Sequence, residues 1–473
     1  MDAHREARVT IQLGCMRRTS SALLLAAALV LASDPPGFDG TWLGTLEAGP
    51  ARLRLALHLN QTPSGLSASL DSLDQGAMAL PAKAAVSLRS INVEFPTVRA
   101  SFEGALSEDG RQIAGTFRQS GAALPLTFAR VDKIPETRRP QDPVKPYPYD
   151  EQEVSYAGRD VKLAGTLTLP RGKGPHPALL LLTGSGAQDR NEALMGHRPF
   201  LVLADYLTRR GLAVLRMDDR GVGGSTGNLA ATTEDDLTAD ALAGVAYLKG
   251  RREIDPARIG LLGHSEGGLV AALAAARSRG VAFVVMMAGP GVPGDQIIVR
   301  QVETAVKAAG GSPERAAESA AMQRKILDII KQEKDDAAAV EKVRQVLAPV
   351  FGAMPEAARK AKETELRAMT SKWYRSFLAT DPRPALAAIR VPLLAVNGAL
   401  DTQVDAGENL KSIAAALASG GNRDYATVKL PGLNHLLQKA QTGAVTEYQR
   451  IEETINPEAL RTIGDWLAAH TAK

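Results

Sequence analysis

The sequence predicts two folded domains, a small all-β domain followed by a larger α/β domain with a mainly parallel sheet. Between residues 36 and 132, short stretches such as residues 53–59 (LRLALHL) alternate apolar and polar side chains between turn-forming residues. From residue 149 onward, continuous apolar stretches such as residues 178–182 (ALLLL) alternate with helical patterns. A chain of 473 residues is also too long for one ordinary domain.

The first 32 residues are predicted to be a cleaved signal peptide. Arg17 and Arg18 precede eleven apolar residues that end in small side chains at Ala32. The alternative, a membrane anchor, needs roughly 20 apolar residues to span a bilayer. We therefore expect cleavage after Ala32 and export to the periplasm or beyond, with no membrane association after signal removal. Met16, just before the basic residues, is an alternative start of translation.

Charge and cysteine content exclude several classes of function. The 56 Lys and Arg residues nearly balance 52 Asp and Glu residues and form no like-charge block, so nucleic-acid binding is not expected. The single cysteine, Cys15, lies in the predicted signal segment. The mature chain would therefore have no disulfide, no thiolate nucleophile and no cysteine metal site.

The all-β domain, residues 36–132, is predicted to be a sandwich or barrel of seven or more strands, and no group of catalytic residues is found in it. Residues 133–148 contain five prolines and no apolar period, which is typical of a linker.

The α/β domain, residues 149–473, is predicted to be doubly wound, with helices on both faces of its sheet. Residues 290–384 are rich in Ala, Glu, Lys, Arg and Gln at helical spacing, which predicts a helical insertion. Because long insertions tend to be functional, we expect a cap over the carboxyl edge of the sheet rather than a surface decoration. The strands are expected at residues 161–169, 178–182, 213–217, 259–262, 281–288, 391–396 and 425–430.

A strand, the pentapeptide GHSEG at residues 263–267 and a small-residue helical stretch follow one another directly. A serine between two glycines at a sharp strand-to-helix turn is typical of a nucleophile elbow. The pattern predicts Ser265 as a nucleophile. A serine hydroxyl is weakly nucleophilic at neutral pH and needs a base, usually a histidine that a carboxylate orients.

The base and the carboxylate are predicted from their positions after strands. His435 lies in the loop that follows the last predicted strand, whereas His264, next to the nucleophile, is expected to point away from it. Asp401 follows the strand at residues 391–396 and gives the order Ser, Asp, His that such folds use. Asp405 is the alternative carboxylate, and its other interpretation is a helix N-cap.

The intermediate needs N–H donors for its oxyanion, normally the one after the nucleophile and one from an earlier loop. The backbone N–H groups of Glu266 and Ser185 are the predicted donors, with that of Gly186 as an alternative to Ser185. Asp189 and Arg190 either pair to brace this loop or are surface charges. The glycine-rich residues 219–225 lack the pattern of a phosphate-binding loop and are interpreted as a structural turn.

The motifs TGSGAQDRN, DDRGVGGSTG, GHSEGG, NGALDTQV and LPGLNH occur in this order and resemble the α/β-hydrolase superfamily over residues 149–473. Within it the chain is similar to exported two-domain bacterial carboxylesterases and to serine aminopeptidase-like and prolyl-oligopeptidase-like hydrolases. The resemblance implies Ser265 as nucleophile, Asp401 as acid and His435 as base. Thr183 departs from the pattern, since many relatives have histidine there.

We therefore expect a serine esterase that forms an acyl-enzyme intermediate, a mechanism that requires neither a metal nor an organic cofactor. The resemblance implies a small-molecule ester with a short acyl chain. A peptidase, aminopeptidase or amidase with the same triad is the first alternative, in which Glu266 or a cap acid would anchor a peptide N-terminus. The second is a catalytically silent protein that binds a carbohydrate or a protein partner.

Overall fold

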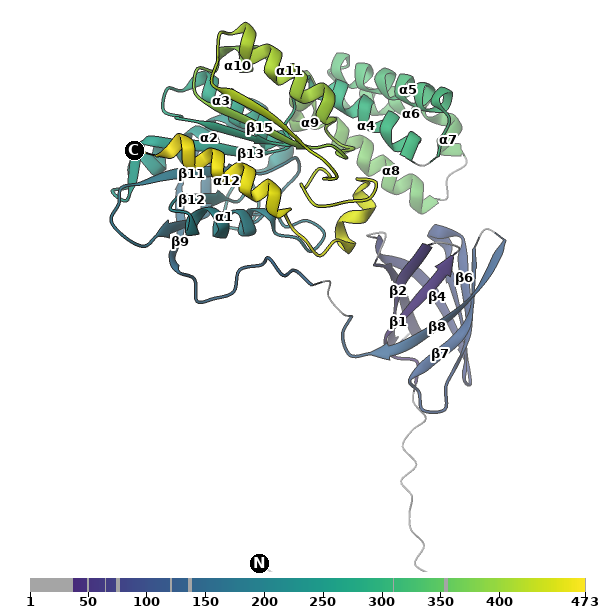
Figure 1. Ribbon diagram of the computed structural model, residues 1–473. Helices are drawn as coiled ribbons and strands as arrows, with labels where there is room; N and C mark the ends of the chain where they lie inside the picture. Colours follow the sequence, from purple (N-terminus) through teal and green to yellow (C-terminus); the bar gives the residue numbers. More distant parts are fainter. Residues whose placement is uncertain are drawn as a thin grey trace, which may run out of the picture.

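The computed structural model describes most of the chain from residue 37 onward (Figure 1). The predicted signal peptide, residues 1–32, lies outside the described residues. In the part of the chain that is described, no helix is long and apolar enough to cross a membrane. The described residues are 37–48, 51–63, 65–73, 77–119, 121–134, 138–308, 310–352 and 356–472.

The first domain is a closed barrel of eight antiparallel strands. The first strand pairs with both the second and the eighth, and these pairings close the sheet. A closed sheet has no unpaired edge to which another chain could add a strand. The elements are β1 (Gly40–Ala48), β2 (Ala51–Thr62), β3 (Gly65–Ser72), β4 (Ala77–Ser87), β5 (Ser90–Phe95), η1 (Pro96–Val98), β6 (Ala100–Leu106), β7 (Gln112–Gln119) and β8 (Ala122–Val131).

Large apolar side chains fill the barrel. Trp42, Phe102 and Phe128 are all fully buried, and the two phenylalanine rings meet edge to face with centroids 5.1 Å apart. Aromatic side chains bury large areas and dominate the energetics of a small core. The interior of the barrel is therefore a packed core, which stabilises the domain without contributing to the site described below.

The second domain contains an eight-stranded sheet in the order β16-β15-β14-β13-β11-β12-β10-β9. The pairs from β12 to β16 are parallel, whereas β10 is antiparallel to both β9 and β12. The edge strand β9 was not predicted, because its sequence YDEQEVSYA is polar and has no apolar run. The strands are β9 (Tyr149–Ala157), β10 (Lys162–Pro170), β11 (His176–Leu182), β12 (Ala213–Met217), β13 (Ile254–His264), β14 (Val284–Met287), β15 (Leu393–Gly398) and β16 (Tyr425–Leu430).

Helices cover both faces of this sheet and bury its central strands, which explains their continuous apolar runs. One face packs against α1 (Pro199–Arg209) and α12 (Pro457–Thr471). The other packs against α2 (Glu234–Lys249), α3 (Glu266–Arg277) and α11 (Ala406–Ser419). Two short 3-10 helices lie in connecting loops, η2 (Leu229–Ala231) and η3 (Val445–Arg450).

Seven helices lie between β14 and β15, where the sequence predicts a helical insertion. Figure 1 shows most of them as a separate green group beside the sheet. The apolar cluster of the insertion includes Leu327, Leu366 and Leu378, together with Leu269 and Leu273 of α3. Its helices are α4 (Gly294–Ala308), α5 (Pro313–Gln332), α6 (Asp336–Val346), α7 (Ala348–Gly352), α8 (Glu356–Met369), α9 (Lys372–Ala379) and α10 (Pro382–Ala388).

The described end of the proline-rich connection, from residue 138 onward, is attached to the second domain. The guanidinium of Arg139 donates hydrogen bonds to four backbone oxygens of that domain, which come from two loops far apart in the sequence. Hydrogen bonds from a charged donor are stronger than neutral ones. Arg139 therefore holds this end of the connection together with Gln141 and Asp142, which also bind the second domain. The acceptors are Met195, Gly196, Gln449 and Ile451.

Candidate active site

Ser265 lies in a strained turn between β13 and α3. Its φ of 52° and ψ of −122° are unusual for a residue with a side chain. The flanking glycines make this turn feasible: a Cβ atom at Gly263 would lie 1.9 Å from the backbone oxygen of Gly267, and one at Gly267 would lie 2.1 Å from that of Leu182. The half-buried Ser265 is thus presented at the carboxyl end of the central strand.

His435 and Asp401 form a buried pair at the same edge of the sheet. His435 Nδ1 lies 2.7 Å from Asp401 Oδ2, and the two residues are 4% and 7% exposed. Asp401 Oδ1 accepts hydrogen bonds of 2.8 Å from the backbone N–H groups of Gln403 and Val404. The carboxylate is therefore fixed from its own loop and oriented toward the imidazole.

Asp405, the alternative carboxylate, is a helix N-cap in the structure. It is the N-cap of α11, and its Oδ1 accepts a 2.8 Å hydrogen bond from the backbone N–H of Glu408. An Asp in this position satisfies a free N–H at the helix terminus. The structure pairs His435 with Asp401.

His264 joins the turn that contains Ser265, here called the nucleophile turn, to the loop that carries His435. Its Nδ1 lies 2.8 Å from Glu192 Oε1 and its Nε2 lies 3.2 Å from the backbone oxygen of His435. The two imidazole rings lie 4.8 Å apart. Among the hydrogen bonds of the described residues, none joins Ser265 Oγ to the His435 ring. Such bonds are often long in ligand-free enzymes and shorten with substrate.

The loop that follows β11 contains Ser185 and is here called the oxyanion loop. It passes directly beside Ser265. A Cβ atom at Gly184 would lie 3.4 Å from the Cβ atom of Ser265. The Gly184 N–H is already used, since it donates a 2.7 Å hydrogen bond to Glu192 Oε1. Within the described ranges, the backbone N–H groups of Ser185 and Glu266 have no hydrogen-bond partner. Both predicted oxyanion donors are therefore available to a ligand.

Asp219, from the glycine-rich loop after β12, holds both ends of this oxyanion loop. Its Oδ1 accepts a 2.7 Å hydrogen bond from the Thr183 hydroxyl, and its Oδ2 accepts a 2.9 Å bond from the Gln188 N–H. Burial, together with the nearby carboxylates of Glu266 and Glu192, raises the pKa of Asp219 to about 7 despite these bonds. Thr183 thus has a hydrogen-bond partner, Asp219, in this chain.

Asp189 and Arg190 do not pair with each other. Asp189 accepts hydrogen bonds from the backbone N–H groups of Asn191 and Ala193 and so closes its own turn. Arg190 instead binds Asp218 through both Nε and Nη2. Asp218 and Asp219, at the start of the glycine-rich loop, therefore contact the loop after β11 in different ways.

The side chain of Glu266 lies under the nucleophile turn and contacts the helical insertion. Trp373 of α9 donates a 2.7 Å hydrogen bond from its indole nitrogen to Glu266 Oε1. The carboxyl group of Glu234 also faces Glu266, and both residues are less than 5% exposed. Burial and the neighbouring carboxylate hold the pKa of Glu234 well above its usual range.

Sequence reasoning missed Glu192, Asp219 and Trp373 as parts of this site. Glu192 is 1% exposed and has a positive φ of 54°, and it directly follows the motif TGSGAQDRN without being part of it. Its contact with His264 spans 72 positions, and that of Trp373 with Glu266 spans 107. Local patterns cannot indicate contacts of this range.

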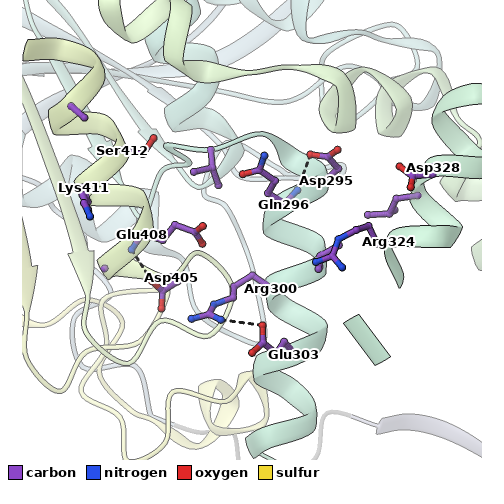
Figure 2. A pocket seen from close by; sticks show the side chains of 15 residues that line it. Asp295, Gln296, Arg300, Glu303, Arg324, Asp328, Asp405, Glu408, Lys411 and Ser412 are labelled. Carbon is purple, nitrogen blue, oxygen red and sulfur yellow. Dashed lines mark hydrogen bonds and ion pairs between the residues drawn. The ribbon is translucent and has the colours of Figure 1, made fainter. Parts of the chain in front are cut away.

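A cavity of about 1040 Å³ lies between α4, α5 and α11 (Figure 2). None of its lining residues belongs to the Ser265, Asp401 and His435 group. Acidic and basic side chains alternate along its walls, and Figure 2 shows Arg300 directed toward Glu303 on the same helix. Because acidic and basic side chains pair locally along this wall, the cavity shows no preference for an anionic or a cationic ligand.

Comparison with known proteins places the chain in a family. A family described as serine aminopeptidase, S33, matches residues 198–439, a span that includes Ser265, Asp401 and His435. Esterase EstD of Thermotoga maritima is 32% identical over 188 residues, which are 40% of this chain and 43% of EstD. An uncharacterized protein of Mycobacterium tuberculosis is 37% identical over 123 residues, or 24% of this chain and 40% of that protein.

Among solved structures, an esterase of Pyrococcus furiosus aligns with 72% of this chain and 100% of its own at 18% identity, with a TM-score of 0.44. The chain spans less than half the length of the curated relatives that it matches. The S33 family covers about half of the chain and includes the whole nucleophile turn. The chain therefore belongs to the S33 serine aminopeptidase-like family of α/β hydrolases.

Proposed function

We propose that this hydrolase cleaves carboxylic esters, with Ser265 as nucleophile, His435 as base and Asp401 as the acid that orients the base. The single observation that carries the proposal is the 2.7 Å contact between Asp401 and His435. This pair lies at the same edge of the sheet as the turn that presents Ser265. A buried carboxylate on Nδ1 leaves Nε2 of the ring as the atom that accepts a proton.

In the proposed reaction, His435 takes the proton of the Ser265 hydroxyl while Ser265 Oγ attacks the ester carbonyl. The N–H groups of Ser185 and Glu266 stabilise the oxyanion that forms. His435 then donates its proton to the departing alcohol, which leaves an acyl group on Ser265. A water molecule, deprotonated by the same histidine, releases the acid and restores the serine.

The surroundings of Glu266 favour esters over peptides with a free N-terminus. An aminopeptidase needs an exposed carboxylate near the serine to bind the substrate ammonium group. Glu266 is 4% exposed, and its carboxylate already contacts Trp373 and Glu234. It is therefore not free to bind an ammonium group. The similarity to a protein named esterase supports the same choice.

The helical insertion is proposed to be a cap that shapes the substrate site. Its helix α9 contacts the nucleophile turn through Trp373, and its helix α4 contacts the Asp401 loop through Gln301. The resemblance described above implies a short acyl chain. The walls of the insertion, considered in the next section, bear directly on that length.

The proposal is tested by hydrolysis of p-nitrophenyl acetate and butyrate by the chain without residues 1–32, beside Ser265→Ala. Loss of a triad serine costs up to about 10⁶ in kcat. We expect ester turnover that disappears in the variant, together with labelling of Ser265 by a serine-reactive phosphonate. Turnover that persists in Ser265→Ala would overturn the assignment, and no labelling would favour a silent binding protein.

An aminopeptidase is the second candidate, because one acid of the insertion, Glu318, is exposed on the wall of a cavity near the site. A panel of aminoacyl p-nitroanilides separates the two functions. Cleavage of the anilides at rates comparable to those of the esters, lost in Glu318→Gln, would move the assignment to a peptidase.

A further inference from the structure

A second cavity, of about 760 Å³, lies inside the helical insertion, between α4, α5, α8 and α9. Apolar side chains form most of its wall, and two of them, Ile326 and Leu366, are at most 5% exposed. Trp373 and Met369 add an aromatic ring and a flexible thioether. A concave, mainly apolar wall with few polar groups is typical of sites for small organic ligands.

One end of this cavity meets the nucleophile turn. Trp373 lines the cavity, and its indole nitrogen lies 2.7 Å from the carboxylate of Glu266, the residue after Ser265. Trp373 therefore joins the cavity wall to the side chain of the residue that follows the predicted nucleophile.

A second connection leads to the predicted acid. Gln301 of α4 also lines the cavity, and its amide donates a 3.0 Å hydrogen bond to the backbone oxygen of Gln403. The N–H of Gln403 in turn donates to the carboxylate of Asp401. The cavity therefore lies against both the Glu266 side chain and the Asp401 loop, and none of its lining residues belongs to the Ser265, Asp401 and His435 group.

The charged residues of the cavity wall do not favour a ligand of either charge. The exposed Arg315 and Glu318 carry opposite charges, and Lys362 pairs with Glu365 at 2.7 Å. The interior between them is apolar, which makes a charged occupant unfavourable without a partner. The cavity therefore matches a neutral, apolar group.

We propose that this cavity receives the acyl chain of the ester substrate, and that the enzyme prefers acyl chains longer than butyrate. This inference rests on the proposed function. Each methylene group taken out of water contributes up to about a 4-fold factor in kcat/KM. We therefore expect kcat/KM for p-nitrophenyl octanoate to exceed that for the acetate by at least about 10-fold.

The test compares p-nitrophenyl acetate, butyrate, octanoate and decanoate in the wild type, Ser319→Phe and Ala317→Phe. Ser319 lines the cavity from α5, whereas Ala317 lies on the same helix, is exposed and does not line it. Ser319→Phe is expected to lower kcat/KM for octanoate at least about 10-fold and to leave acetate within about 2-fold, because only the long chain reaches the added ring. Ala317→Phe should leave both unchanged.

The acetate arm reports the proposed function, and the ratio of octanoate to acetate reports the cavity. Should Ser319→Phe fail to fold, Val302→Phe fills the same cavity from α4. Acetate turnover with no gain for octanoate, or an equal loss for both esters in Ser319→Phe and Val302→Phe, would overturn the cavity assignment and leave the esterase standing. No ester turnover at all would instead contradict the proposed function.

Discussion

His264 Nε2 lies 3.2 Å from the backbone oxygen of His435, so the residue before the nucleophile holds the loop of the predicted base. The other nitrogen of the same ring lies 2.8 Å from the Glu192 carboxylate. A carbonyl and a carboxylate can only accept, and both ring nitrogens must then donate. The protonated form of His264, which donates from both nitrogens, is the form that satisfies both contacts. Burial alone would lower the pKa of His264, but the Glu192 carboxylate raises it above its usual value.

Glu192→Gln is expected to lower kcat about 10-fold near neutral pH and to leave KM within about 2-fold, since the groups that it holds act in the transition state. Without the carboxylate the pKa of His264 falls, so the loss of kcat should grow as the pH rises through about 6.5. In the wild type the raised pKa keeps the His264 proton to a higher pH. Steady-state kinetics across pH provide the measurement.

Glu253→Gln is the control for this change. Glu253 lies at the opposite end of β13 and pairs with Arg251, and its variant should keep the wild-type pH profile. A loss of kcat in Glu192→Gln that is the same at every pH would show that Glu192 stabilises the fold without positioning the active site.

Asp401→Asn is expected to lower kcat by about 10⁴, because an amide beside Nδ1 no longer stabilises the imidazolium that forms during catalysis. Asp405→Asn is the matched control four residues away. Asn caps a helix about as well as Asp, so this variant should keep wild-type activity and stability. Initial rates with an ester substrate decide the matter, and the opposite ranking of the two variants would reassign the acid to Asp405.

Asp219→Asn is expected to change the pH dependence of stability. The pKa of Asp219 in the folded chain, about 7, is raised above the usual value. Protonated Asp219 therefore makes its full contribution to the free energy of unfolding below about pH 4, and this contribution is lost as the pH rises to about 7. Asn is neutral throughout, so the variant should match the wild type near about pH 5 and gain in relative stability near about pH 8. Urea midpoints at both pH values measure this, and a constant difference would contradict it.

Arg139→Ala is expected to weaken the attachment of the proline-rich connection to the α/β domain. The change removes donors from four backbone oxygens and should cost about 1–3 kcal/mol in the free energy of unfolding of that domain. Arg138→Ala is the control, because Arg138 is exposed. Limited proteolysis should cleave residues 133–148 faster in Arg139→Ala alone. Equal cleavage in both variants would show that Arg139 does not hold this segment.

Much of the second domain is readable from local sequence. The expected strands at residues 213–217 and 425–430 coincide with β12 and β16. The residues of β12 are all buried, so its apolar run marks a strand covered on both faces, whereas β16 is an edge strand marked by its aromatic and β-branched residues. The edge strand β9 was missed for the opposite reason, since a strand with one solvated face and many charges carries little apolar signal. In the first domain, alternation predicts strands but does not distinguish a sandwich from a barrel, because closure depends on the pairing of β1 with β8.

By itself, the sequence determined the fold class and the candidate residues Ser265, Asp401 and His435, because each follows a strand and carries its signal in its immediate neighbours. Only the tertiary structure decided that Asp401 rather than Asp405 faces His435. It also decided the contacts of Glu192, Asp219 and Trp373, which join segments 36 to 107 positions apart. Such contacts depend on how the strands are ordered in the sheet and where the insertion packs, and neither is encoded within any one stretch of the chain.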